Sequence, residues 1–180
     1  MSNVKNQPQS PFNKENLKLE PLLQWICDKC GTIIQKPNEG MLVWRQNENG
    51  QAKDFRIVHK GNCDDKTLYT QSFEMNWLLG KKGIENFLYL LSDGYIFVNH
   101  YKLNEPTQYK PKVENLNDFV DLFRRFQLPY YEAARILFNR EDIRNELIAE
   151  GHNESSPYTE ETLKNIIEKY CNEKTLTYEF

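Results

Sequence analysis

The sequence has no long run of apolar residues, and no charged-then-apolar leader opens it. Because a helix needs roughly 20 consecutive apolar residues to cross a bilayer, we expect no membrane segment and a cytoplasmic protein. A glycine-rich phosphate loop, a Gly-x-Ser-x-Gly turn and a His-Glu-x-x-His motif are also missing. No residue therefore stands out as catalytic. The sequence favours a protein without enzymatic activity, while the enzyme class stays open.

An excess of positive charge is missing as well. The formal net charge is −3, and 39% of the residues are hydrophobic, which is typical of a globular chain. Residues 21–66 carry seven Lys and Arg against six Asp and Glu, whereas residues 113–172 carry seven against twelve. Non-specific binding of nucleic acid requires a basic surface, so this distribution argues against it but leaves room for a small basic patch.

Cysteine is scarce, yet three of the four cysteines fall in one stretch at spacings typical of metal ligands. Cys27 and Cys30 form a Cys-x-x-Cys pair, and His59 and Cys63 form a His-x3-Cys pair. Two thiolates at this spacing can reach one ion, and four such donors suit a tetrahedral Zn²⁺. We therefore predict a zinc site at Cys27, Cys30, His59 and Cys63.

A β-hairpin is predicted between the two ligand pairs. Residues 40–45 and 53–59 are rich in strand-forming side chains, and Asn49-Gly50 between them is a strong turn signal. Folding this hairpin returns His59 to the first ligand pair. The stretch is thus typical of a zinc ribbon.

Two other roles are open to these cysteines. A disulfide would fit an oxidising compartment, and a redox Cys-x-x-Cys usually opens a helix in a βαβ unit. Neither context is visible in the sequence, so zinc is favoured. Three Cys and one His fill the tetrahedral shell and leave no position for water, which favours a structural ion over a catalytic one.

The pattern predicts an α+β fold, in which an N-terminal zinc-ribbon β-hairpin is followed by a mainly helical C-terminal part. The expected segments are a flexible tail (1–20), the zinc ribbon (21–66), a middle helix with short β segments packing on the ribbon (67–103), a connector (104–112), a helical bundle (113–172) and a C-terminal tail (173–180). A peptide arm that docks on a partner chain would give the same N-terminal composition as a tail.

In the middle segment we expect a short strand at residues 67–70, followed by a helix from Lys82. Its apolar residues recur at helical spacing. The expected buried face consists of Ile84, Phe87, Leu88 and Leu91.

In the helical bundle, Asn115 or Asn117 is expected to cap a helix that ends before Pro129. Pro129 suits the first turn of the next helix. Whether the residues from there to Gly151 form one helix or two is open. The last helix is expected to bury Leu163, Ile166, Ile167 and Tyr170.

One polar cluster in the helical part is a candidate binding site. It contains Arg124, Arg125, Tyr130, Tyr131, Glu132 and Arg135. Either these residues balance charge at two helix ends and include an Arg–Glu pair, or they form a surface for an anionic or aromatic ligand such as a partner peptide or nucleotide. His100, in the middle segment, is expected to be a packed side chain rather than an acid/base group.

Three pieces of the sequence carry a resemblance. They are Trp-x-Cys-x-x-Cys-Gly at 25–31, Phe-x-Ile-Val-His at 55–59 and Arg-Arg-x3-Pro-x-Tyr-Glu-x-Ala-Arg at 124–135. With these motifs the chain resembles a group of small uncharacterised bacterial proteins. The resemblance implies a zinc ribbon fused to helices, and it brings no activity with it.

Three functions are compatible with these features, and the oligomeric state cannot be predicted. The leading hypothesis is a non-enzymatic binding or adaptor protein with a structural zinc, whose partner is a macromolecule and most simply a protein. The alternative is a nucleic-acid-binding zinc ribbon in which Trp44 stacks on bases. Its basic residues would be Lys36, Arg45, Lys53, Arg56 and Lys60. The third is an enzyme with a site near His100 or near Arg124, Tyr131 and Glu132.

Overall fold

The computed structural model describes residues 18–91, 112–152 and 156–172. Within these ranges the chain forms two small antiparallel sheets and five α-helices, with the strands in the N-terminal part. The strands are β1 (Trp25–Ile26), β2 (Ile33–Ile34), β3 (Gly40–Gln46), β4 (Ala52–His59) and β5 (Gln71–Glu74). The helices are α1 (Gly80–Leu91), α3 (Leu116–Gln127), α4 (Tyr131–Leu137), α5 (Glu141–Ala149) and α6 (Glu160–Asn172), and the short 3₁₀ turns are η2 (Pro37–Glu39), η3 (Met75–Leu78) and η4 (Ser156–Tyr158). The mixed α+β class is therefore as predicted.

The hairpin predicted between the two ligand pairs is present. Strands β3 and β4 pair antiparallel with Gly40 opposite His59, and β5 adds to the other edge of β3. At the turn, the carboxamide oxygen of Asn47 accepts hydrogen bonds from two backbone N–H groups, and Gly50 has a φ of +78°. Glycine adopts a positive φ without steric cost, so this turn residue closes the hairpin as its sequence indicates.

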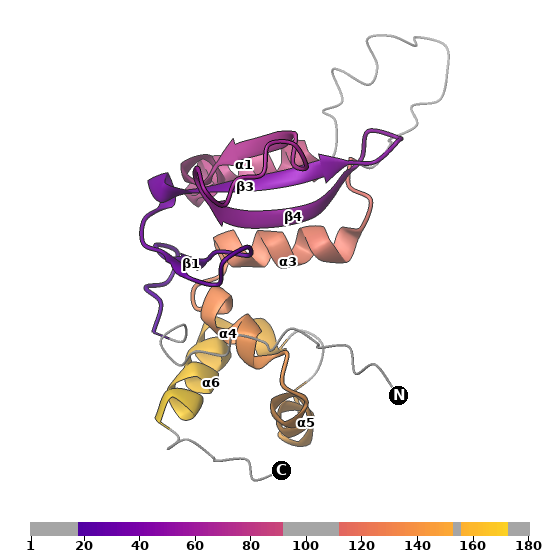
Figure 1. The fold of residues 1–180 in the computed structure, drawn as a ribbon. Coiled ribbons are helices and arrows are strands. Elements are labelled where there is room, and N and C mark those ends of the chain that lie inside the picture. The colour runs from indigo at the N-terminus through magenta and orange to yellow at the C-terminus, as the bar shows by residue number, and fades with distance from the viewer. Residues whose placement is uncertain (1–17, 92–111, 153–155, 173–180) are drawn as a thin grey trace, which may run out of the picture.

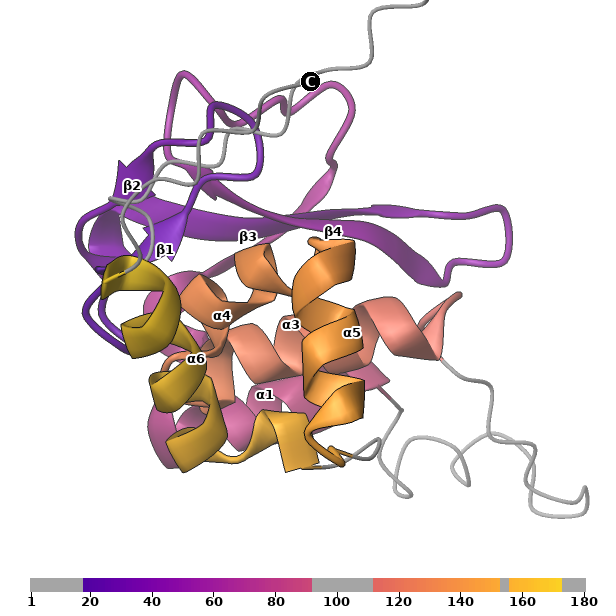
Figure 2. The same cartoon turned by 90° about the horizontal axis from the view of Figure 1, so that it is seen from below.

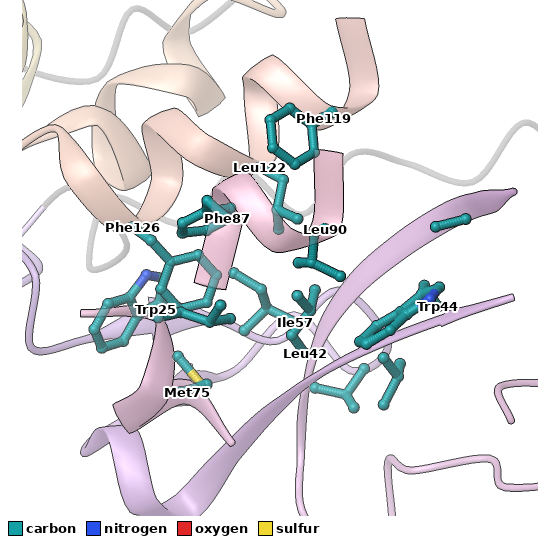
Figure 3. Packing of buried hydrophobic residues seen from close by; sticks show 14 of the residues in the cluster. Trp25, Leu42, Trp44, Ile57, Met75, Phe87, Leu90, Phe119, Leu122 and Phe126 are labelled. Atoms are coloured by element: carbon teal, nitrogen blue, oxygen red, sulfur yellow. The ribbon is translucent and has the colours of Figure 1, made fainter. Parts of the chain in front are cut away.

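The three-stranded sheet packs on α1 and α3 through one apolar cluster. Helix α3 contacts β4, and α1 contacts α3. Figure 3 shows Leu42 and Ile57 of the sheet beside Leu90 of α1, with Trp25 and Phe126 close to each other. This buried cluster thus combines residues from three predicted segments: the ribbon, the middle segment and the helical bundle.

Helices α4, α5 and α6 form a second apolar cluster. In Figure 1, α3 lies between the sheet and these three helices, and Figure 2 gives the view from below, with α5 in front of α3. The buried members from the helices are Tyr131, Ala133, Ala134, Leu137, Ile143, Leu147, Leu163, Ile166, Ile167 and Tyr170. Ile26 of β1 and Leu19, which falls within the predicted tail, are buried in the same cluster. The N-terminal strand therefore touches the helical part directly.

Several helix ends agree with the sequence signals. The side chain of Asn115 accepts a hydrogen bond from the backbone N–H of Asn117 and caps α3. Helix α3 ends at Gln127, before Pro129. The following residues form two helices, α4 and α5, and α6 buries the predicted stripe. Among the helices within the described ranges, none combines the length and apolar character needed to cross a membrane.

The strand expected at residues 67–70 is wrong. This segment is a turn, because the Asp65 carboxylate accepts hydrogen bonds from the backbone N–H groups of Thr67 and Leu68. Such a side-chain bond competes with strand pairing. The strand begins directly after the turn, as β5.

The expected buried face of α1 is wrong in part. Phe87 is buried, but Ile84 and Leu88 are 44% and 60% exposed, and the helix instead buries Gly83 and Leu90. Gly83 lies so close to η3 that an added Cβ would stand 2.2 Å from the carbonyl oxygen of Leu78. Because Gly83 has no side chain, α1 can approach η3 closely at this residue. The helix is thereby rotated, so that part of the face expected to be buried is exposed instead.

Pro129 also departs from its expected place. It lies in the turn before α4 rather than in the first turn of the helix, and Tyr130 with a φ of +67° precedes the helix start at Tyr131. His100 and most of the predicted connector lie outside the described residues, so their predictions are untested.

Candidate metal centre

The four predicted ligands lie close together. Cys27 and Cys30 lie in the turn that joins β1 to β2, His59 is the last residue of β4, and Cys63 lies in the turn that follows. The three sulfur atoms and one ring nitrogen of His59 are all within 4.8 Å of one another. These residues could therefore hold one metal ion.

Hydrogen bonds fix the first ligand pair in a tight turn. The backbone N–H of Cys27 donates to the carbonyl of Thr32, and that of Gly31 donates to the carbonyl of Cys27, each at 2.9 Å. The hydroxyl of Thr32 also lies 3.1 Å from the sulfur of Cys30. Such contacts around the ligands orient the thiols toward a common point.

The ring of His59 is oriented by the backbone of β2. Its Nε2 lies 3.3 Å from the carbonyl oxygen of Ile33, and its Nδ1 lies 3.5 Å from the sulfur of Cys30. A carbonyl oxygen only accepts hydrogen bonds, so the proton belongs on Nε2. Nδ1 is then left with its lone pair facing the thiols, which is the arrangement a metal ligand needs.

The thiols influence one another strongly. Burial raises the pKa of Cys30, but hydrogen bonds with Thr32 and with the Cys27 and Cys63 thiols outweigh it and lower the pKa to about 6. Burial and the neighbouring Cys30 and Cys27 sulfurs raise the pKa of Cys63 to about 11. The opposite shifts mean that the Cys30 thiol ionises more readily than an ordinary cysteine, whereas the Cys63 thiol ionises less readily. A bound cation would remove this conflict, because its charge favours every thiolate at once.

Asp28, between the two cysteines of the first pair, joins this turn to the rest of the fold. Its backbone N–H donates to the carbonyl of Ile57 at 2.8 Å, and its carboxylate accepts from the backbone N–H of Ile57 at 2.7 Å. The same carboxylate accepts from Arg125 at 2.7 and 3.1 Å and from Arg135 at 3.2 Å. The turn that carries two ligands is therefore bound to both β4 and the helices.

Arg125 and Glu132 form the buried centre of this network, with exposed fractions of 4% and 6%. The Arg125 guanidinium donates to both carboxylate oxygens of Glu132, at 2.7 and 2.9 Å. Glu132 also accepts from the backbone N–H of Ile26 at 3.1 Å, and the Trp25 indole donates to the Arg125 carbonyl at 3.0 Å. Strand β1 is thereby bonded to α3 and α4.

Burial raises the pKa values of Asp28 and Glu132, but the positive charges of Arg125 and Arg135 outweigh it and hold both below their ordinary values. Both carboxylates are therefore charged at neutral pH. Together with the two arginines they form a balanced set of four charges, which we name the Asp28 network.

The structure places the six predicted ligand-binding residues mainly in internal contacts. Arg125, Glu132 and Arg135 belong to the Asp28 network, and the buried Tyr131 donates its hydroxyl proton to Asp121 at 2.5 Å. The guanidinium of Arg124 lies 3.6 Å from the ring centre of Tyr158. A binding role for Arg124, Tyr130 and their neighbours stays a prediction. Asp28 was missed, because no sequence spacing connects it to residues about a hundred positions later.

The hairpin does not offer the stacking surface expected of a nucleic-acid-binding ribbon. Trp44 is only 6% exposed, and its ring contacts Phe55 and Phe73 at centroid distances of 6.2 and 5.2 Å. Its expected role as an accessible stacking platform is wrong. Three of the five predicted basic residues also have acidic partners, in the pairs Arg45–Asp54, Lys53–Glu114 and Lys60–Glu74.

One cavity of about 220 Å³ borders the Asp28 network. It is lined by Asp54, Phe55, Asp118, Asp121, Leu122 and Arg125. These residues include three carboxylates but no histidine or cysteine, and the Arg125 guanidinium is already bonded to Asp28 and Glu132. The lining therefore contains no Ser–His or Cys–His pair.

No model of a known protein family, no curated protein and no solved structure matches this chain. The resemblance to bacterial zinc-ribbon proteins therefore gains no support from these comparisons. The Cys/His cluster is the feature on which a function can be argued.

Proposed function

We propose that Cys27, Cys30, His59 and Cys63 bind one structural Zn²⁺, and that the chain is a non-enzymatic binding or adaptor protein for another protein. The observation that carries the proposal is the closed set of four soft donors within 4.8 Å of one another. Three sulfurs and one imidazole nitrogen suit Zn²⁺, whereas Mg²⁺ and Ca²⁺ prefer oxygen ligands. With four protein ligands, the ion has no position for a substrate or a reactive water.

The internal pairing of charged residues and the exposure of apolar residues on α1 support a binding role. The charged groups of the Asp28 network pair with one another, and the cavity beside them contains no histidine or cysteine. By contrast, helix α1 exposes Ile84 and Leu88, which lie four residues apart on one helical face. We propose this apolar face as the contact surface for the protein partner. Nucleic acid is less well supported, because Trp44 is buried and two basic residues of the hairpin, Arg45 and Lys53, are paired with carboxylates.

Metal analysis tests the zinc site. The purified chain is expected to contain about one zinc per molecule, and Cys30→Ser is expected to lose most of it, because a tetrahedral site needs all its ligands. Cys171→Ser is the matched control, since Cys171 lies in α6 and outside the cluster. Absence of zinc from the wild-type chain, or equal zinc in both variants, would overturn this part of the proposal.

Isolation from the host organism tests the binding role. A protein partner is expected to copurify with the wild-type chain, and Leu88→Lys is expected to reduce its recovery at least about tenfold by placing a charge in an apolar contact. Glu85→Lys on the same helix is the control, since Glu85 is exposed and polar. Turnover of a small molecule, abolished by a single surface substitution, would contradict a non-enzymatic role.

A further inference from the structure

Asp28 belongs to the metal centre and to the Asp28 network at the same time. It stands between Cys27 and Cys30, so its backbone is part of the turn that a metal ion would close. Its side chain accepts hydrogen bonds from Arg125 of α3 and Arg135 of α4. One residue therefore connects the metal-binding turn to two helices that lie about a hundred residues later.

The small sheet that carries this turn has little stability of its own. Strands β1 and β2 are two residues long and pair only through Trp25–Ile34 and Ile26–Ile33. An isolated two-stranded ladder is marginal in water even when it is longer. A bound ion that contacts Cys27 and Cys30 from the turn and His59 and Cys63 from the hairpin would add the missing constraint.

The Asp28 network is stable only as a complete set. Arg125 is almost wholly buried and has Asp28 and Glu132 as its counter-ions. Loss of one partner leaves a buried charge uncompensated, which costs several times more than a surface ion pair contributes. If the turn carrying Asp28 loses its shape, the contact between α3, α4 and β1 loses its electrostatic balance as well.

We infer that metal occupancy controls how firmly helices α4 to α6 dock on the sheet, with Asp28 as the residue that couples the two. The metal-bound turn holds Asp28 against Arg125 and Arg135, and release of the metal frees these helices from β1. The inference rests on the proposed zinc site and adds regulation to it.

Hydrogen exchange of the full chain tests the coupling. Removal of zinc from the wild type by a chelator is expected to speed amide exchange in α4, α5 and α6 at least about tenfold, while the amides of α1 change much less. Asp28→Asn keeps the four ligands and the side-chain size, so it is expected to retain zinc and still show the fast exchange in α4 to α6. Glu74→Gln, in the exposed pair with Lys60, is the control and is expected to behave like the wild type.

Affinity for zinc supplies the reciprocal measurement, because coupling between two sites acts equally in both directions. Arg125→Met is expected to bind zinc about tenfold more weakly in competition with a chelator, although Arg125 is not a ligand. Gly83→Ala, which disturbs α1 instead, is expected to leave zinc affinity unchanged.

Each outcome is decisive. The coupling is overturned if zinc-bound Asp28→Asn keeps the wild-type protection of the amides in α4 to α6. It is also overturned if zinc removal from the wild type reduces protection of the α1 amides as much as that of the amides in α4 to α6. Both results leave the proposed zinc site unaffected. A wild-type chain without zinc overturns the proposed function first and the coupling with it.

Discussion

The buried side chain of Arg125 is hydrogen-bonded to three other residues. Arginine is almost never fully buried unless it is paired. Here the guanidinium donates five hydrogen bonds, to Asp28, to Glu132 and to the Ile26 carbonyl. The planar guanidinium meets Glu132 with two parallel N–H donors, a geometry that lysine cannot provide.

Removal of this side chain is predicted to be costly. Arg125→Met is expected to lower the free energy of unfolding by about 3–5 kcal/mol, because Asp28 and Glu132 remain as negative charges without their main counter-ion. Lys60→Met, which breaks the exposed pair with Glu74, is expected to cost less than about 1 kcal/mol. Urea unfolding of both variants measures the difference, and equal losses would show that the buried network contributes little.

Among the elements, α1 depends on a residue without a side chain. Gly83 allows the helix to approach the carbonyl of Leu78, and Gln127 of α3 donates a hydrogen bond to that same carbonyl at 2.7 Å. Three elements thus meet at one backbone oxygen.

Gly83→Ala is predicted to destabilise the fold by about 1–3 kcal/mol, because the new Cβ forces α1 away from η3. Helix propensity alone predicts the opposite sign, since Ala stabilises a helix by roughly 1 kcal/mol relative to Gly. Urea unfolding therefore discriminates between the two effects. A more stable variant would mean that the helix moves aside without cost, and Glu85→Ala on the exposed face controls for propensity.

The sequence predicted those elements whose signals are local. The hairpin follows from its strand formers and Asn49-Gly50, the α3 cap follows from Asn115, and the grouping of Cys27 with Cys63 follows from the spacing and the hairpin between them. The contact of Asp28 with Arg125 could not be predicted, because it depends on how distant elements pack. The prediction of the buried face of α1 failed for the same reason, since the close backbone contact at Gly83 overrides the apolar pattern.

On the scale of the whole molecule, two apolar clusters meet at the Asp28 network. The first joins the sheet to α1 and α3, and the second joins α4, α5 and α6 to Ile26 of β1. The network lies where β1, α3 and α4 come together, so its charge state affects the contact between the clusters.

This arrangement predicts an acid-sensitive fold. The folded-state pKa of Glu132 is lowered from its ordinary value of 4.5, so its stabilisation is fully present above that value and is lost as the pH falls through the folded-state pKa. Below pH 4.5, the free energy of unfolding of the wild type is expected to fall more steeply than that of Glu132→Gln, by up to about 1.4 kcal/mol per pH unit.

Urea unfolding at several pH values measures this difference. The two chains differ only at residue 132, so the difference in slope is assigned to Glu132. Parallel slopes would contradict the assigned charge state.

The bond from the Trp25 indole to the Arg125 carbonyl spans 100 residues. During synthesis the N-terminus leaves the ribosome first, so all four cysteine and histidine ligands emerge long before α3 does. These four residues can therefore come together early, yet the Trp25 indole cannot form its bond to the Arg125 carbonyl until α3 has been translated. Over that interval, the indole N–H of Trp25 lacks the acceptor that it has in the folded protein.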